Sequence, residues 1–405
     1  MSDISIPNFR FKKYTSNLVK TKLSKIATFN PKSLLPENFK YIDLESVLGT
    51  ELVSCREETR ETAPSRAQRV AQKGDVFYQL VRPYQKNNYL FDLNENNYVF
   101  STGYAQLRPK VDSAFLLARL QEEGFVNKVI ERCTGTSYPA INSKDLSKIS
   151  ITIPEDLEEQ SAIGSLFRTL DDLLASYKDN LANYQSLKAT MLSKMFPKAG
   201  QTVPEIRLDG FEGEWENIRL GDCAIIKGRL GWKSLKQEEY TEVGPSMIAG
   251  KHIKNGVIDW VEVDHIPQWR YDESPDIMLE NGDIIFSKDG SLGNPALVSN
   301  LKGEATINST MMLVRLEKKV SSQFFYQVLT SSVFQKLIYL KVSGSSIPHL
   351  FQADMQDFRF FAPCIEEQQA IGTYFYNLDS LISAHQEKIL QLETLKKKLL
   401  QDMFI

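Results

Sequence analysis

The chain of 405 residues is long enough for two or three domains, each with its own hydrophobic core. A hydrophobic fraction of 42% and a charged fraction of 24% are ordinary for a globular protein. The sequence has neither an apolar secretion signal nor an apolar run long enough to span a membrane. A net charge of −3 argues against bulk non-specific attraction to polyanions, and the four scattered cysteines indicate reduced thiols rather than disulfides.

Residues 1–153 are predicted to form a first domain of mixed helices and strands. A strand is expected at 76–78, after a Gly-Asp turn, and a helix at 112–123. The stretch 62–90 has a net charge of +4, because five basic side chains face a single acidic one, Asp75. Such a stretch favours nucleic-acid binding only weakly, since local basic stretches also arise by chance.

A long helix is predicted within residues 154–197. Apolar and aromatic side chains recur there alternately three and four positions apart, and no Pro or Gly interrupts the pattern after Gly164. This spacing predicts a coiled-coil seam, which requires a partner helix. The predicted seam residues of this helix are Phe167, Leu170, Leu174, Tyr177, Leu181 and Tyr184.

Residues 198–362 are predicted to contain a linker and a second mixed domain. A strand is expected at 284–286, again after a Gly-Asp turn, and a helix at 322–339. The stretch 227–256 has a net charge of +3, from six basic and three acidic side chains.

Residues 363–405 repeat the long helix 208 residues later, with 15 identities in 39 ungapped positions. Both copies follow a proline and begin with Glu-Glu-Gln, whereas the sequence between them largely diverges. The copy is the obvious partner for the first helix, so the two helices are expected to pair. The predicted seam residues of the second helix are Phe375, Leu378, Ile382, Ile389, Leu392 and Leu399.

The residue clusters expected of an enzyme are missing from the sequence. The four histidines are isolated, so neither catalytic residues nor metal ligands are predicted. Residues 244–252 do not match a phosphate loop, because five positions rather than four separate the glycines. Pro275-Asp276 with Glu317-Lys318-Lys319 mimics a nuclease pattern, but only one half of the duplication carries it.

Taken together, these motifs resemble the specificity (S) subunit of type I restriction–modification systems. The resemblance covers nearly the whole chain and rests on 204–215, on the two Gly-Asp strands, and on the two Glu-Glu-Gln helices. The first domain lacks the glycines and the tryptophan of the opening motif. The implied fold class is α+β (mixed α/β), with two target recognition domains, each followed by a long helix, and with the two helices pairing as an antiparallel coiled coil.

The resemblance also implies a function. The chain would recognise a bipartite, asymmetric site in double-stranded DNA and dock two methyltransferase (M) subunits. It would not be an enzyme by itself but part of an adenine-N6 DNA methyltransferase and type I site-specific deoxyribonuclease complex. No cofactor is expected in this chain, because the M subunits would bind S-adenosylmethionine and the restriction (R) subunits ATP and Mg. A cytoplasmic protein of a bacterium or archaeon, without membrane association, is expected.

Candidate DNA-contacting residues lie in or near the two basic stretches, where cationic side chains could anchor phosphates and polar ones could read base edges. The charged candidates could instead be solvated surface charges. Arg82 could form a structural salt bridge, and Trp232 could be a core residue. The candidates are Arg66, Arg69, Arg82, Tyr84 and Lys86 in the first domain, and Arg229, Trp232, Lys233, Lys251, Lys288 and Ser291 in the second.

Two alternatives remain open from the sequence. One is a stand-alone DNA methyltransferase or nuclease, against which the missing catalytic motifs count. The other is a duplicated coiled-coil assembly protein without DNA binding, against which the basic stretches and the domain cores count.

Overall fold

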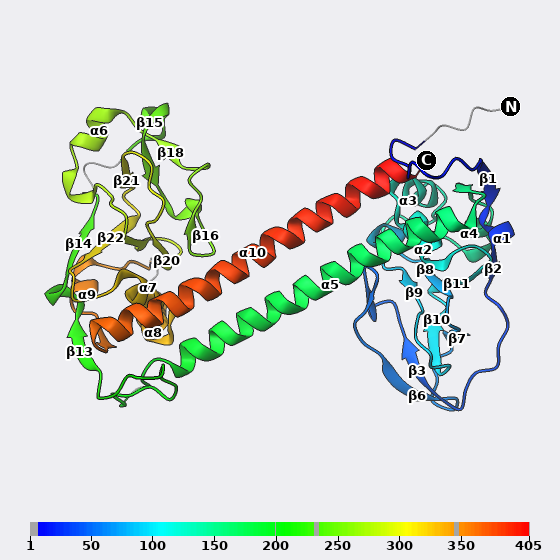
Figure 1. The fold of residues 1–405 in the computed structure, drawn as a ribbon, viewed down its shortest axis with the longest axis horizontal. Coiled ribbons are helices and arrows are strands. Elements are labelled where there is room, and N and C mark those ends of the chain that lie inside the picture. The colour runs from blue at the N-terminus through cyan, green and yellow to red at the C-terminus, as the bar shows by residue number, and fades with distance from the viewer. Residues whose placement is uncertain (1–6, 199, 231–234, 344–347, 405) are drawn as a thin grey trace. The chain divides into compact units, whose positions relative to one another are not determined.

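The computed structural model describes residues 7–198, 200–230, 235–343 and 348–404. The chain divides into two compact units (Figure 1). Unit 1 contains Met1–Asn180 and His385–Ile405, and unit 2 contains Leu181–Ala384. Each long helix therefore contributes one of its ends to each unit, which a division into consecutive domains along the sequence does not anticipate.

Unit 1 is built on two four-stranded sheets and two two-stranded ones, of which one is the pair β4-β5. The first sheet has the order β2-β11-β8-β9, the second β6-β3-β10-β7, and β1 pairs with β12. The strands are β1 (Leu18–Lys22), β2 (Ala27–Phe29), β3 (Asn38–Ile42), β4 (Val47–Leu48), β5 (Glu51–Leu52), β6 (Arg56–Thr59), β7 (Ala67–Val70), β8 (Val76–Gln79), β9 (Tyr89–Leu90), β10 (Tyr98–Ser101), β11 (Tyr104–Pro109) and β12 (Ser150–Pro154). The helices are α1 (Leu23–Ile26), the 3-10 turn η1 (Pro83–Gln85), α2 (Ser113–Gln121), α3 (Glu123–Ile130), α4 (Ser143–Ser147) and the first part of α5 (Leu157–Lys194).

Unit 2 has the same plan. Its sheets have the orders β14-β22-β19-β20 and β18-β15-β21, and β13 pairs with β23. The strands are β13 (Glu216–Arg219), β14 (Ala224–Gly228), β15 (Thr241–Ile248), β16 (Ile253–Lys254), β17 (Val257–Ile258), β18 (Asp264–His265), β19 (Ile284–Ser287), β20 (Gly293–Leu297), β21 (Ala305–Ile307), β22 (Met311–Leu316) and β23 (Arg359–Ala362). The helical elements are η2 (Leu220–Asp222), η4 (Gln237–Glu239), η5 (Gly250–His252), α6 (Gln268–Asp272), η6 (Pro275–Ile277), α7 (Ser322–Thr330), α8 (Ser332–Ser343), α9 (Gln352–Gln356) and α10 (Ile365–Met403).

The two units share the four-strand order of the first sheet and three strands of the second. In the antiparallel sheet that packs against the helices, β8 and β11 of unit 1 correspond to β19 and β22 of unit 2. The second sheet holds a parallel pair in both units, β3 with β10 and β15 with β21. The duplication that is visible in the helical sequences therefore extends through both variable domains, and the mixed α/β fold class is confirmed.

The Gly-Asp turns have the same structural role in both units. Asp75 is buried; its carboxylate accepts a hydrogen bond from the backbone N–H of Gln72 at 2.9 Å and pairs with Arg108 at 2.9 Å. In unit 2, Asp283 binds the N–H of Glu280 at 2.7 Å and pairs with Arg315 at 2.8 Å. A buried carboxylate needs such partners to offset its desolvation, and here they fix the turn before each core strand.

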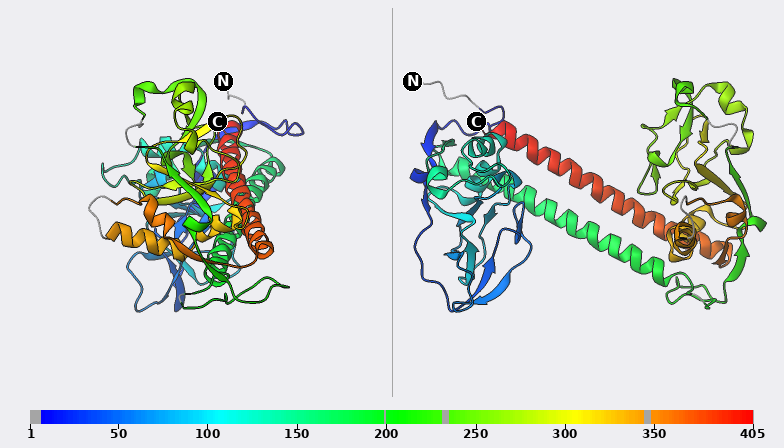
Figure 2. Two further views of the ribbon diagram at one scale, coloured as in Figure 1. Left: turned by 90° about the vertical axis from the view of Figure 1, so that its left-hand side faces the viewer. Right: turned by 180° about the vertical axis from the view of Figure 1, so that it is seen from behind.

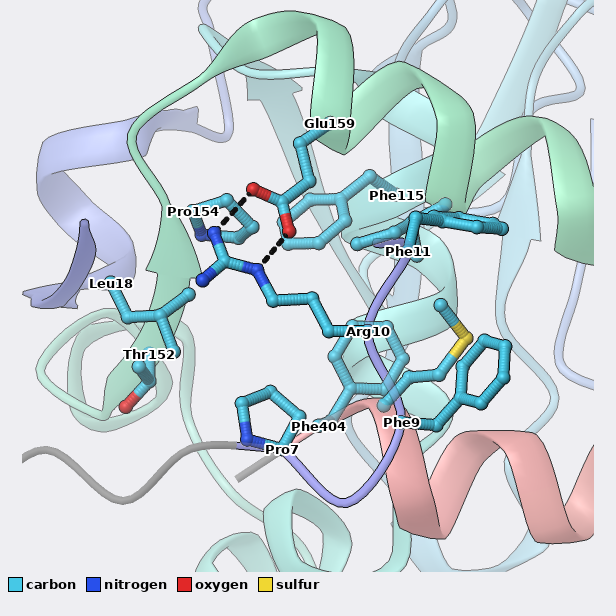
Figure 3. A pocket seen from close by; sticks show the side chains of 12 residues that line it. Pro7, Phe9, Arg10, Phe11, Leu18, Phe115, Thr152, Pro154, Glu159 and Phe404 are labelled. Atoms are coloured by element: carbon cyan, nitrogen blue, oxygen red, sulfur yellow. Dashed lines mark hydrogen bonds and ion pairs between the residues drawn. The ribbon is translucent and has the colours of Figure 1, made fainter. Parts of the chain in front are cut away.

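The Glu-Glu-Gln motif joins the start of each long helix to its domain. The second glutamate of unit 1, Glu159, is buried and receives two hydrogen bonds of 2.6 Å from the guanidinium of Arg10 (Figure 3). A ring of apolar side chains surrounds this pair, and the remaining cavity of about 20 Å³ has room for little more than a water molecule. Arg207 and Glu367 form the equivalent pair in unit 2, at 2.7 Å.

The glutamine of the motif aligns a second helix. Gln160 donates to the Pro154 carbonyl at 2.8 Å and accepts from the backbone N–H of Asp112, the N-cap of α2, at 3.3 Å. Gln368 does the same with Pro363 and with Ser321, the N-cap of α7. The Glu-Glu-Gln motif therefore has a structural role in both copies.

The helix pairing predicted from the 3-4 spacing is confirmed (Figure 2). Every predicted seam residue is buried or half-buried in its own unit. In unit 1, α5 and the end of α10 run antiparallel. Lys178 of α5 lies 3.1 Å from Glu393 of α10, and the ring of Phe167, earlier in α5, stacks on the ring of Phe404, which follows α10. The stretch 322–339, predicted as one helix, is two: Ser331 adopts an extended conformation between α7 and α8, and its hydroxyl donates to the Val328 carbonyl.

Candidate nucleic-acid interface

The loop after core strand β8 presents a cation stacked on an aromatic ring. Arg82 has a left-handed backbone (φ 54°), and its guanidinium lies 4.4 Å from the ring centroid of Tyr138. The backbone N–H of Arg82 donates to the Pro139 carbonyl at 2.7 Å, which ties the loop to the segment 134–140. Tyr84 lies on η1 beside it and is half exposed. Stacked arginine and exposed tyrosine are groups that bind phosphates and bases.

Lys86 lies at the end of the same loop but is less available. Its ammonium pairs with the carboxylate of Glu123, at the start of α3. A lysine whose charge is already matched contributes less to phosphate binding.

Arg66 and Arg69 lie at β7, on another part of unit 1. Arg66 is exposed, whereas Arg69 is half-buried beside a hollow of about 590 Å³. Burial lowers the pKa of Arg69, and its Nε atom has no hydrogen-bond partner among the described residues. The structure therefore separates the five candidates of the first domain into two groups, one at 82–86 and one at β7.

In unit 2, the loop equivalent to Val81–Tyr84 carries different side chains. Asp289 forms a β-bridge with His349, as Val81 does with Ala140 in unit 1, and the carboxylate of Asp289 pairs with the His349 ring. Lys288 pairs with Asp289 at 3.1 Å, and Ser291 is exposed at the turn. Lys288 and Ser291 thus lie on the same loop, on either side of Asp289, the residue that corresponds to Val81 of unit 1.

The prediction that Arg229 contacts DNA is wrong for this structure. Its side chain is fully buried, and it donates to the Ile307 carbonyl at 3.0 Å and to the hydroxyls of Ser274 and Thr306. Burial lowers the pKa of this guanidinium, with partial compensation from Glu273. Basic character in the sequence did not distinguish a core arginine from a surface one.

The remaining candidates of the second domain are only partly placed. Lys251 is exposed, and its ammonium lies 2.9 Å from the carboxylate of Asp264. It is distant in sequence from the loop that carries Lys288. Trp232 and Lys233 lie outside the described residues. Sequence reasoning missed Tyr138 as the partner of Arg82, because Tyr138 lies outside the basic stretch 62–90 in which the candidates were sought.

A metal centre has no counterpart in the part of the chain that the structure describes. Within residues 7–198, 200–230, 235–343 and 348–404, no three His, Cys, Asp or Glu side chains gather where they could hold an ion. Among the helices in those ranges, none combines the length and the apolar character needed to cross a bilayer.

Comparison with known proteins identifies the repeated domain. The family model described as "Type I restriction modification DNA specificity domain" matches residues 68–183 and 212–394. The chain belongs to this family. The two matches correspond to the two copies of the fold described above.

Known members of the family are similar over most of the chain. The type I restriction enzyme MjaVIII specificity subunit of Methanocaldococcus jannaschii is 22% identical over 72% of this chain and 69% of its own length. A second specificity subunit of that organism, described as the putative MjaX subunit, is 22% identical over 71% of this chain and 65% of its own length.

Solved structures share the fold. The type I restriction–modification S subunit from M. genitalium aligns over 99% of both chains, with a TM-score of 0.69 and 16% identity. A chain from a study of complex assembly and conformational transition of the type I R-M system aligns over 96% of this chain and 98% of its own, with a TM-score of 0.51 and 21% identity. At these identities the structural likeness establishes the fold alone.

Proposed function

We propose that this chain is the non-catalytic subunit that gives a type I restriction–modification complex its DNA sequence specificity. One observation carries the proposal: the polar contacts that hold the fold recur in both units, whereas the exposed loops differ. Asp75 and Asp283 hold the same turn, but the loops that follow present Arg82 in one unit and Asp289 in the other. One frame with two different surfaces suits the recognition of two different half-sites.

In this proposal each unit reads one half of a bipartite, asymmetric site in double-stranded DNA. The half-exposed Tyr84 and the stacked Arg82 are the strongest candidates in unit 1. An arginine that is held by stacking loses little side-chain entropy on binding, and its fork of donors matches a guanine edge or a phosphate. Lys288 and Ser291 are the corresponding candidates in unit 2.

The helices are proposed to dock two methyltransferase subunits. In unit 1, Leu173 of α5 and Leu395 of α10 are 41% and 45% exposed, although both belong to a paired helix. In unit 2 the repeat-equivalent residues, Leu381 and Leu187, are 44% and 38% exposed. The four leucines occupy a position next to the seam, so each unit offers an apolar pair on its helical surface. Two equivalent apolar pairs fit two copies of one partner.

The chemistry is assigned to the partners. Methyltransferase subunits would bind S-adenosylmethionine and methylate adenine at N6, and restriction subunits would use ATP and Mg. A target base must leave the DNA stack before it is methylated, so the recognition domains would hold the surrounding duplex during that step.

The test is to exchange the first domain. The chain is produced with its methyltransferase partner, and residues 8–150 are replaced by the corresponding segment of another family member. Sequencing of methylated genomic DNA should show that one half of the modified motif changes and the other stays. The matched control replaces unit 2's domain and should change the other half. If both halves change in each exchange, or neither does, the two units do not read independently.

A second measurement separates docking from recognition. Replacement of Leu173 and Leu395 by Ser should reduce co-purification of the methyltransferase subunit. Replacement of Arg82 by Ala should leave co-purification unchanged and weaken DNA binding by about 1–3 kcal/mol. Loss of co-purification in both variants would mean that the loop, too, is part of the protein–protein interface.

A further inference from the structure

Unit 1 has one leucine that the fold leaves almost completely in solvent. Leu34, on the loop between β2 and β3, is 92% exposed. Its neighbour Leu35 instead packs against a cluster that contains Phe39 and Val99. The loop thus buries one leucine of the pair and projects the other.

The loop is held in place at both ends. Asn30 has a left-handed backbone (φ 45°), and its side chain accepts a hydrogen bond from the backbone N–H of Gln106 at 2.9 Å. At the other end, the guanidinium of Arg60 donates to the Leu35 carbonyl at 3.1 Å. Pro31 and Pro36 restrict the backbone between these anchors. A projecting side chain on an anchored loop can enter a partner at a low cost in entropy.

Leu34 lies at the hollow that also contains Arg69. Of the described residues that line this hollow of about 590 Å³, Lys32 and Arg69 are basic and none is acidic. Arg69 Nε has no hydrogen-bond partner among the described residues, and Lys32 is exposed. A hollow whose two charged lining residues are both cationic fits a polyanion.

We propose that the loop 31–36 enters a groove of duplex DNA, with Leu34 inserted between base pairs and with Lys32 and Arg69 on the flanking phosphates. Apolar side chains that enter the minor groove unstack a base step and bend the duplex, and basic neighbours compensate the cost through phosphate contacts. The inference rests on the proposed function, since it assigns this contact to the DNA that unit 1 reads. It adds a second contact surface to the Arg82 loop.

The experiment uses the full chain in complex with its methyltransferase partner. The probe is a duplex that carries the methylated motif of the wild-type complex, with 2-aminopurine placed in turn at each adenine of the half-site assigned to unit 1 except the adenine that is methylated, because methylation itself takes that base out of the stack. The wild-type complex should raise the fluorescence at one step, because unstacking relieves quenching. Leu34→Ala should abolish that rise and weaken binding about tenfold, since the contacts that the bent duplex permits would be lost. Leu48→Ala, at another leucine of unit 1 that is 68% exposed, should change neither quantity.

The phosphate contacts are tested by salt dependence. Lys32→Gln should reduce the slope of log K against log salt by about one, because one fewer counterion is released. Arg69→Lys should keep the charge and the slope but bind more weakly, since a lysine lacks the fork of donors. If Leu34→Ala leaves both the fluorescence and the affinity unchanged, Leu34 is not inserted between base pairs. This result would overturn the inference without contradicting the proposed function, provided that the motif is still methylated. Normal DNA binding with loss of the methyltransferase subunit in Leu34→Ala would identify a protein-docking loop instead. A wild-type complex that methylates no specific motif would contradict the proposed function itself.

Discussion

Lys188 of α5 donates a hydrogen bond of 2.5 Å to Asp379 of α10 in unit 2. The repeat-equivalent residues exchange roles in unit 1, where Lys396 of α10 pairs with Asp171 of α5. Each helix therefore supplies the lysine of one pair and the aspartate of the other. A pairing of this kind fixes both the antiparallel direction and the register, because a shift by one turn would separate both pairs.

The first prediction concerns that register. Asp379→Lys should destabilise unit 2, since it places two partly buried ammonium groups side by side. Adding Lys188→Asp should restore most of the stability, with a coupling energy of about 1 kcal/mol in a double-mutant cycle. The exposed pair Lys178–Glu393 serves as a control and should give a smaller coupling, because both side chains are about half exposed. Equal coupling for both pairs would indicate that burial does not strengthen the Lys188 contact.

The second prediction concerns Gly164 in α5. Alanine in a helix interior normally stabilises by roughly 0.5–1 kcal/mol relative to glycine. Here the added Cβ would lie 2.5 Å from Asp112 Oδ1 and 2.7 Å from the backbone nitrogen of Phe115. Because Asp112 caps α2, we expect Gly164→Ala to destabilise unit 1 by about 1–3 kcal/mol. Thermal unfolding checks this, with the exposed Ser165→Ala as control, which should be neutral or slightly stabilising. A rise in stability for Gly164→Ala would show that α2 can move away at little cost.

The third prediction separates a structural arginine from a DNA-binding lysine. Arg229→Met should destabilise unit 2 by about 2–4 kcal/mol, because it leaves the Ile307 carbonyl without its donor. The salt dependence of DNA binding, measured where the variant is folded, should not change. Lys251→Ala should have the reverse profile if Lys251 contacts a phosphate: normal stability and a slope reduced by about one. A reduced slope for Arg229→Met would reinstate this residue at the DNA surface.

The fourth prediction is a pH dependence in unit 2. His252 is buried, and its Nδ1 accepts a hydrogen bond from the backbone N–H of Ala249 at 3.0 Å. Burial lowers the pKa of His252, and the nearby Asp264 only partly opposes this effect. A lowered pKa means that the contribution to stability is present above the ordinary value of about 6.5 and is lost as the pH falls through the folded-state value.

Unfolding measured between neutral and mildly acidic pH checks that dependence. The wild type should lose more stability on acidification than His252→Gln, whose side-chain oxygen can still accept the Ala249 N–H but does not titrate. Parallel loss in both proteins would assign the pH dependence to other groups.

The long helices show how much a periodic sequence can predict. The seam from Phe167 to Tyr184 could be predicted because a sustained 3-4 spacing is typical of paired helices, and the duplicated copy indicated the partner. The loops were not readable in this way, because the same basic residue types serve in a core and on a surface. Arg229 and Arg82 lie in similar basic stretches, yet one hydrogen-bonds inside the domain and the other stacks on Tyr138.

The sequence by itself determined the duplicated architecture, the helix pairing and the family, because each of these depends on patterns that repeat along the chain. Only the tertiary structure decided that each unit takes one end of each long helix, that Arg229 is internal, and that Leu34 projects beside Arg69. Those features depend on contacts between segments far apart in the sequence. Burial and hydrogen bonding at such contacts are set by the packing of the whole unit, so local residue types do not reveal them.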